Sequence, residues 1–312
     1  MMSLRYHVVS IAAVFMALAL GVVLGSTSLS DRLLAGVGGE RQSLREQVDS
    51  LEAERTALKA QVAASEQFDA AVGPMAVRGQ LAQRSVVLII TAEVSDQRRA
   101  AVAQLLRAAG ADVTGEVRLG EAFTSPDRAD QLRWVVTELL PAGLQLPTAA
   151  DPGTLAGSLI GPLALLNPQS GQPQTSDLAR AAAFAGLADG GFATASPGLR
   201  PAQLAVVLTG GRMAGDDPGD RAATLARFAT QLDRSGQGAV LAGAAGSAAG
   251  TGAVGVARAD PAIASVLSTV DNLDTAAGRV AVVLALREQA DRQTGHYGAA
   301  STAQGPVPGT RD

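Results

Sequence analysis

The chain has 312 residues, of which 47 % are hydrophobic and 17 % charged, so it is long and apolar enough to bury the core of one substantial domain. Its net charge is −4, its aromatic content is 3 % and Lys59 is its only lysine, a composition without the basic stripe that nucleic-acid binding requires. The absence of cysteine from the sequence excludes disulfides, thiolate nucleophiles and thiolate metal sites.

The first predicted element is an apolar segment near the N-terminus. Val8–Ser30 is an unbroken run of 23 uncharged residues, and its apolar part, Val8–Leu24, approaches the length that crosses a hydrocarbon core of about 30 Å. A cleaved export signal has the same features, a basic start at Arg5 followed by an apolar stretch. The sequence after Leu24 has no clear Ala-x-Ala cleavage site, so residues 1–30 are predicted to be a transmembrane anchor or an uncleaved signal.

Basic residues flank this segment on both sides and do not decide its orientation. Arg5 precedes it, whereas Arg32, Arg41 and Arg45 follow it. A seven-residue head is most simply left in the cytoplasm while the long remainder crosses. We therefore expect a single-pass protein of the cell membrane or outer envelope, in contact with membrane lipid and with the bulk of the chain extracytoplasmic.

The next predicted element, residues 40–70, is a coiled-coil helix that follows a glycine-rich break at residues 36–39. Apolar residues recur with heptad spacing, and the predicted seam consists of Leu44, Val48, Leu51, Arg55, Leu58 and Val62. With the leucines at d, Arg55 occupies an a position, where a charge lowers stability but fixes register. Glu54 then lies at g and Lys59 at the following e, the spacing of an interchain ion pair.

This pattern predicts a parallel homodimer or a higher oligomer, which suits chains anchored at the same end. The alternative is a lone amphipathic helix that folds back on its own domain, because three heptads are short for an independent coiled coil. Tethering in a membrane raises the effective concentration of partner helices and favours pairing.

Residues 84–290 are predicted to form a layered α/β domain with a mostly parallel sheet of four to six strands. Short runs that are apolar at every position alternate with helical stretches, as in strands covered on both faces by helices. Helices are predicted at residues 97–109, 127–140, 155–165, 177–187 and 220–233, and strands at residues 86–90, 113–117, 204–208, 239–242 and 280–286. Residues 291–312 have no apolar periodicity and are predicted to be a disordered tail.

Groups that exchange protons or attack a substrate are sparse. The two histidines, His7 and His296, lie outside the predicted domain, Lys59 lies in the coiled coil, and there is no Gly-x-Ser-x-Gly elbow. The glycine-rich segment 243–252 follows a strand but matches neither a dinucleotide-binding fingerprint nor a P-loop, so it is interpreted as a packing loop. We expect a protein that is not an enzyme, with neither catalytic nor cofactor-binding residues and no cofactor.

No spacing typical of a metal site is present either. Acidic residues cluster at 216–220 and at Asp271-x-x-Asp274, where they are interpreted as turn and capping residues, with Asp220 capping the next helix. The five methionines are scattered along the chain. Trp134, the only tryptophan, is predicted to pack in the core or under its helix.

Several motifs together resemble the actinobacterial copper transport protein family named after mycobacterial MctB. The resemblance covers nearly the whole length and rests on the head Ser3–Ser10, the continuation Gly21–Ser26, the segment Ser268–Asp274, Gly278-Arg279 and the closing His296-Tyr297-Gly298. It implies an envelope protein involved in copper efflux or homeostasis, with copper ion as the transported species and a channel in the outer membrane.

The residues themselves favour a different picture of how such a protein works. Outer-membrane barrels need segments of about ten residues that alternate apolar and polar, whereas residues 86–90 and 280–286 are apolar throughout. Two hypotheses therefore follow. The first, from the resemblance, is copper efflux or homeostasis, with the chain as a channel component. The second, from the architecture, is a non-enzymatic coiled-coil scaffold or regulator that binds a cell-wall or division enzyme in the envelope.

Overall fold

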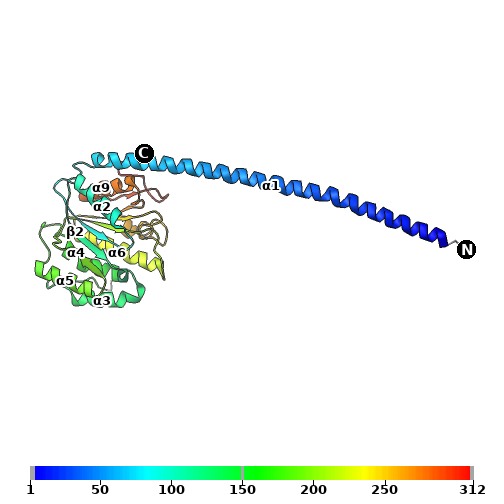
Figure 1. Ribbon diagram of the computed structural model, residues 1–312. Helices are drawn as coiled ribbons and strands as arrows, with labels where there is room; N and C mark the ends of the chain where they lie inside the picture. The colour runs from blue at the N-terminus through cyan, green and yellow to red at the C-terminus, as the bar shows by residue number, and fades with distance from the viewer. Residues whose placement is uncertain (1–3, 149–150, 310–312) are drawn as a thin grey trace. The chain divides into compact units, whose positions relative to one another are not determined.

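The computed structural model describes residues 4–148 and 151–309 (Figure 1). The chain divides into two compact units, with the boundary between Ser65 and Glu66. The first unit consists of a single helix in its described part, and the second contains a layered α/β fold.

The first unit is formed by α1 (Leu4–Ala76), whose last residues, from Glu66, belong to the second unit. The helix continues through residues 36–39, where the sequence analysis predicted a break. Glycine costs about 1 kcal/mol in a helix relative to alanine, but it keeps the backbone N–H that the helix needs. Glycine therefore weakens this stretch without ending the helix.

The described residues form a seven-stranded sheet in the order β3-β2-β1-β4-β5-β6-β7. All neighbouring pairs are parallel except β2 and β3, which are antiparallel. This confirms the predicted α/β class and the mostly parallel sheet, although the strands exceed the predicted four to six. The strands are β1 (Ser85–Ile90), β2 (Asp112–Leu119), β3 (Ala193–Ala195), β4 (Leu204–Thr209), β5 (Ala239–Gly243), β6 (Ser268–Val270) and β7 (His296–Tyr297).

Helices cover both faces of this sheet (Figure 1). On β1, Val87 and Ile89 pack into a core with α3, α4, α5, α6 and α7, while Val86, Leu88 and Ile90 pack into a second core with α2 and α9. A run that is apolar at every position is thus explained by a strand buried on both sides. The helices are α2 (Asp96–Ala108), η1 (Glu121–Phe123), η2 (Pro126–Arg128), α3 (Ala129–Glu138), α4 (Pro152–Ala164), α5 (Asp177–Asp189), α6 (Pro218–Ser235), α7 (Ala253–Ala259), α8 (Pro261–Ala264) and α9 (Ala276–Ala290).

Side-chain caps fix the starts of several helices. Ser95 is the N-cap of α2 and Ser176 is the N-cap of α5, and each hydroxyl accepts a hydrogen bond from the backbone N–H three residues on. The predicted cap of α6 is wrong: the helix begins at Pro218, and Asp217, not Asp220, lies at the N-cap with a φ of 48°. Proline at the first helical position supplies the favoured φ, so the helix starts earlier than the acidic pattern indicated.

The segment 280–286 was predicted to be a strand, and this prediction is wrong. It lies inside α9, whose hydroxyl cap Thr275 accepts a hydrogen bond from the Gly278 N–H. The helix packs against β4, β5 and β6 on one side and contacts α2 as well, so most of its circumference is buried. A helix that is apolar all round cannot be distinguished from a buried strand by periodicity alone.

The predicted disordered tail is also corrected by the structure. His296 and Tyr297 form β7, which pairs with Thr269 and Val270 of β6, and Tyr297 is buried. The chain then turns back, because the Gly298 N–H donates to the Gly305 carbonyl. A strand of two residues carries no detectable periodicity, and its stability comes from contacts distant in sequence.

The last turns of α1 pack within the second unit. Both carboxylate oxygens of Glu66 accept hydrogen bonds from the Ala276 N–H, at 2.9 and 3.2 Å, at the start of α9. Just beyond the helix, Val77 and Leu81 are fully buried in the same core as α2 and α9. A carboxylate at a helix N-terminus is favoured by the unpaired N–H groups and the helix dipole.

Candidate functional site

The apolar segment near the N-terminus has the properties of a membrane span. Tyr6–Gly25 is helical over 20 residues with a mean hydropathy of 2.6, and none of it is buried within the chain. It is the one helical segment among the described residues that is long and apolar enough to cross a membrane. An exposed apolar surface of this size is stable in lipid and unfavourable in water.

The predicted coiled-coil seam lies on the part of α1 that belongs to the first unit. Its apolar members, Leu44, Val48, Leu51, Leu58 and Val62, are all exposed, by 51 % to 64 %. Arg55, Glu54 and Lys59 are exposed on the same helix. A solvated helix with leucine and valine at heptad spacing is stabilised when a second helix covers these side chains. The structure describes one chain, and the pairing of two chains stays a prediction.

The most developed polar cluster of the second unit surrounds a buried ion pair. The Arg258 guanidinium on α7 lies 2.7 Å from the Asp271 carboxylate, which follows β6, and both side chains are 4 % exposed. The guanidinium also donates to the hydroxyls of Thr269 and Thr302 and to the Tyr297 carbonyl. Every one of its three nitrogens therefore has an acceptor, as a buried cation requires. Burial lowers the pKa of Arg258, although the Asp271 carboxylate opposes this effect.

His296 lies in this cluster rather than in a free tail. Its Nδ1 is 3.0 Å from the Thr269 hydroxyl, which accepts a hydrogen bond from Arg258 Nε. Burial, followed by the nearby charge of Arg258, lowers the pKa of His296 below its ordinary value. A neutral imidazole that accepts the threonine proton at Nδ1 fits both observations.

Asp271 also holds the backbone that follows β7. Its Oδ1 accepts hydrogen bonds from the N–H groups of Ala299 and Ala300, at 2.8 and 3.2 Å. At Gly298, φ is +136° and a Cβ atom would lie 2.3 Å from the same Oδ1. Only glycine fits this position, because both the backbone conformation and the space exclude a side chain.

The family-like motifs noted in the sequence therefore meet in space. Asp271 belongs to the segment 268–274 and Tyr297 to the closing motif, and Arg258 joins the two by donating to the Asp271 carboxylate and to the Tyr297 carbonyl. Sequence reasoning missed Arg258, which lies 13 residues before Asp271 in a seven-residue helix. In the sequence, Arg258 is marked only by its charge inside a stretch of alanine, valine and glycine. This pattern indicates that the arginine has a buried partner, but it does not identify the partner.

Asp274, three residues after Asp271, joins two loops. The Asp274 carboxylate accepts a hydrogen bond from the Ala245 N–H in the glycine-rich loop, so the two loops are joined. In that loop a Cβ on Gly243 would lie 2.3 Å from the Ser247 Cβ, which supports the packing interpretation. Within the described residues, no three His, Cys, Asp or Glu side chains lie close enough to hold a metal ion together.

Backbone hydrogen bonds link the loops at the carboxyl edge of the parallel strands, where open α/β sheets commonly bind ligands. The Ala244 N–H donates to the Gly210 carbonyl, and the Leu273 N–H donates to the Gly243 carbonyl. The loops after β4, β5 and β6 are thereby tied to one another.

The Trp134 side chain is not in the core as predicted: it is 64 % exposed on α3.

Comparisons with known proteins identify relatives along almost the entire chain. The family model described as "Copper transport outer membrane protein, MctB" matches residues 1–308. The protein named copper transporter MctB from Mycobacterium tuberculosis (strain ATCC 25618 / H37Rv) is 42 % identical over 303 residues, which cover 96 % of each chain. The protein of the same name from Mycobacterium leprae (strain TN) is 40 % identical over 306 residues, again 96 % of each chain. The chain belongs to the MctB family of copper transport outer membrane proteins.

Proposed function

We propose that this protein acts in copper efflux from the cell as an envelope-anchored member of its family, with copper ion as the transported species. The observation that carries the proposal is similarity over 96 % of the chain to proteins named copper transporters. The similarity includes the membrane-spanning segment as well as the α/β unit. The alternative role, a scaffold for cell-wall or division enzymes, has no comparable support.

We further propose that the protein is anchored by Tyr6–Gly25 as a single-pass protein, with the α/β unit outside the cytoplasm. The length and hydropathy of this segment support the anchor. Membership of a family described as outer membrane proteins supports a position of the α/β unit outside the cytoplasm. The exposed leucines of the predicted seam support pairing of two chains through residues 40–70. The anchor and the pairing segment lie on one helix, so chains anchored at the same end present their seams in parallel.

The proposed role requires no catalysis by the chain. Copper is the cargo here, and the polar cluster around Arg258 and Asp271 holds the fold together. Arg258 and Asp271 are paired with each other, and the Nδ1 of His296 contacts Thr269. We propose accordingly that the protein is not an enzyme.

Copper content of cells tests the efflux role. Deletion of the gene in its native host should raise cell-associated copper, measured by mass spectrometry after growth in copper-supplemented medium, and the wild-type gene should restore it. Zinc content of the same cells is the control for a general envelope defect. Unchanged copper, or an equal rise of zinc, would contradict the proposal.

The cysteine-free sequence allows a clean test of orientation. Ser301→Cys introduces one thiol at an exposed position of the α/β unit. A membrane-impermeant maleimide should label this variant in cells whose outer layer has been made permeable but whose cytoplasmic membrane is intact. Labelling that appears only after lysis of the cytoplasmic membrane would show the opposite orientation.

A further inference from the structure

The segment that follows β6 in the sheet is attached largely through one residue, His296. Its backbone carbonyl accepts a hydrogen bond of 2.7 Å from the Gln304 N–H, and its own N–H donates to the Gln304 Oε1 at 3.1 Å. Its ring contacts the Thr269 hydroxyl of β6. Within residues 296–305, all of which the structure describes, only Tyr297 belongs to a hydrophobic core. The attachment of this segment therefore depends on polar contacts, several of which meet at His296.

The hydrogen bonds that hold the His296 ring run in one direction. The Arg258 Nε is always a donor, and it donates to the Thr269 hydroxyl at 2.9 Å. That hydroxyl has one proton of its own, and the His296 Nδ1, 3.0 Å away, is its one remaining contact with a polar atom among the described residues. Thr269 is fully buried, so water offers no other acceptor. The proton therefore points to Nδ1, which accepts it only while this nitrogen is unprotonated.

A proton on the His296 Nδ1 would break this arrangement in two ways. The Nδ1–H group would face the Thr269 hydroxyl as a second donor, and the threonine proton would lose its acceptor inside the fold. The imidazolium would also lie one hydroxyl away from the Arg258 guanidinium, and a neighbouring like charge disfavours the charged form.

The charged groups around His296 offer no counter-charge. Arg258 comes from α7, Asp271 follows β6 and Glu288 comes from α9, whereas β6, α8 and residues 298–305 contain no titratable side chain. The Asp271 carboxylate is engaged by Arg258 and by two backbone N–H groups. The Glu288 carboxylate accepts a hydrogen bond from the Tyr297 hydroxyl. In the described part of the chain, neither carboxylate forms an ion pair with the His296 ring.

The direction of the pKa shift of His296 agrees with this geometry. Burial and then the charge of Arg258 lower its pKa below 6.5, while a hydrogen bond with the Ala264 backbone opposes them. The detached segment therefore binds the proton more tightly than the attached one. The stability that the neutral ring contributes is complete above pH 6.5 and is lost as the pH falls from there through the lower pKa of the folded state.

We propose that His296 is an acid-sensitive latch, whose protonation detaches β7 and the residues after it from β6 while the rest of the α/β unit stays folded. Detachment is local because β7 has two residues and lies at the end of the sheet. It removes one fully buried core side chain, that of Tyr297. The detached state exposes the outer edge of β6, whose backbone groups can then pair with another strand.

Hydrogen exchange of the full chain in detergent micelles, followed by mass spectrometry, measures the latch. Exchange is compared at about pH 7.5 and about pH 5.0, after correction for the intrinsic pH dependence of amide exchange. The protection of residues 295–305 should fall by about tenfold in acid, since each unit of pKa difference changes the opening equilibrium tenfold. The strands β1 and β4, in the centre of the sheet, should keep their protection and serve as the internal reference.

The two histidines of the chain provide a matched pair of variants. His296→Gln can accept the Thr269 proton at its Oε1 atom but cannot ionise, so residues 295–305 should keep the same protection at both pH values. His7→Gln removes the other histidine, in the apolar helix Tyr6–Gly25, and should leave the acid effect unchanged.

Asp233→Asn is a second control, because Asp233, with a pKa of about 6, titrates in the same range. Its protonation stabilises the fold in acid, so it cannot produce the expected loss of protection. The acid effect on residues 295–305 should therefore persist in this variant.

His7→Gln also leaves His296 as the only imidazole, so NMR of the ring protons reports its ionisation without a change at the site. The ring should titrate with a midpoint below pH 6.5. The protection of residues 295–305 should be lost between pH 6.5 and this midpoint.

Three results would overturn the proposal. The first is an acid effect that persists in His296→Gln, the second is wild-type protection of residues 295–305 that falls no more in acid than that of β1 and β4, and the third is a ring midpoint at or above pH 6.5. If His296→Gln is already detached at neutral pH, the ring titration and the wild-type exchange still decide. The proposed copper efflux role does not depend on any of these outcomes.

Discussion

The Nη1 atom of Arg258 lies 2.7 Å from the Oδ2 atom of Asp271, and this buried pair joins α7, β6 and the C-terminal segment. Asp271 supplies Oδ2 to the guanidinium and Oδ1 to two backbone N–H groups beyond β7. One carboxylate thus neutralises a buried charge and orders the end of the chain. Its removal should affect both.

Asp271→Ala should lower the free energy of unfolding by about 3–5 kcal/mol, because Arg258 would remain buried without its counter-charge. Chemical unfolding of the full chain in detergent, followed by circular dichroism, measures this loss. Asp112→Ala is the control, since the pair of Asp112 with Arg200 is exposed and worth at most about 1 kcal/mol. Equal losses in the two variants would contradict a special role for the buried pair.

Gly298→Ala should detach the C-terminal segment, because the added Cβ would collide with the Asp271 carboxylate and the backbone φ is unfavourable for alanine. Limited proteolysis with mass spectrometry should show faster cleavage after residue 290 than in the wild type. Gly219→Ala in α6 is the control, since a Cβ there meets no atom within 4 Å. A cleavage rate equal to that of the control would show that the turn tolerates a side chain.

Asp233→Asn should stabilise the fold at neutral and alkaline pH. Burial raises the pKa of Asp233 from 3.8 to about 6, although its hydrogen bond from the Ala239 N–H opposes the shift. The folded state therefore binds the proton more tightly than the unfolded state. The stability that protonation contributes is complete below pH 3.8 and is lost as the pH rises through 6.

An asparagine keeps an acceptor for the Ala239 N–H and carries no charge to desolvate. The variant should therefore be more stable than the wild type at pH 8, by roughly 1–3 kcal/mol, and the difference should shrink as the pH falls below 6. Thermal unfolding at a series of pH values measures it. A gain that is independent of pH would rule out the ionisation of Asp233 as its origin.

Leu51→Gln combined with Leu58→Gln should abolish self-association through the predicted seam, because both residues occupy d positions. Sedimentation of the detergent-solubilised full chain measures the oligomeric state. The matched control is Ala53→Gln with Ala57→Gln, which changes two positions outside the seam. An unchanged sedimentation coefficient in the leucine variant would favour the lone-helix alternative.

Several elements of the α/β unit were predictable because their patterns are local. The segment 86–90 is apolar at every position, and the structure confirms it as the strand β1. The segment 97–109 has helical periodicity and a serine cap before it, and the structure confirms it as the helix α2. β6 and β7 were missed, because strands of three and two residues are too short to show a period. α9 was mistaken for a strand, because the surroundings that bury it come from distant parts of the chain.

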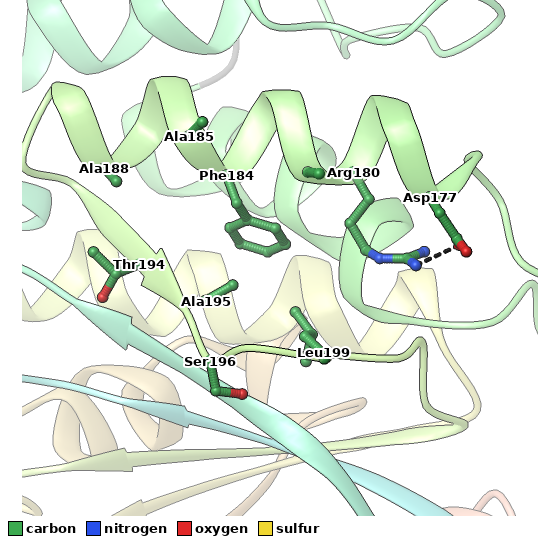
Figure 2. Close-up of a pocket in the computed structure, with 11 residues that line it drawn as sticks. Asp177, Arg180, Phe184, Ala185, Ala188, Thr194, Ala195, Ser196 and Leu199 are labelled. Carbon is green, nitrogen blue, oxygen red and sulfur yellow. Dashed lines mark hydrogen bonds and ion pairs between the residues drawn. The ribbon is translucent and has the colours of Figure 1, made fainter.

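The polar cluster was only partly predictable for the same reason. The sequence singled out Asp271 and His296 because their side chains can ionise, but their roles depend on Arg258 and on the pairing between β6 and β7. The burial of Arg180, whose guanidinium pairs with Asp177 (Figure 2), gave no sequence signal, since an arginine in the first turn of an alanine-rich helix usually points to water. Only the fold shows that this side chain is buried.

The position of β7 has a consequence for synthesis of the protein. The strand comes from residues 296 and 297, so the acceptor that Tyr297 offers to Arg258 emerges from the ribosome later than Arg258 and Asp271. Until then the Arg258 guanidinium lacks the Tyr297 carbonyl as an acceptor, and the outer edge of β6 has no partner strand. A premature stop codon at position 296 would leave both defects permanent, and such a product should be a preferred target of envelope quality-control proteases.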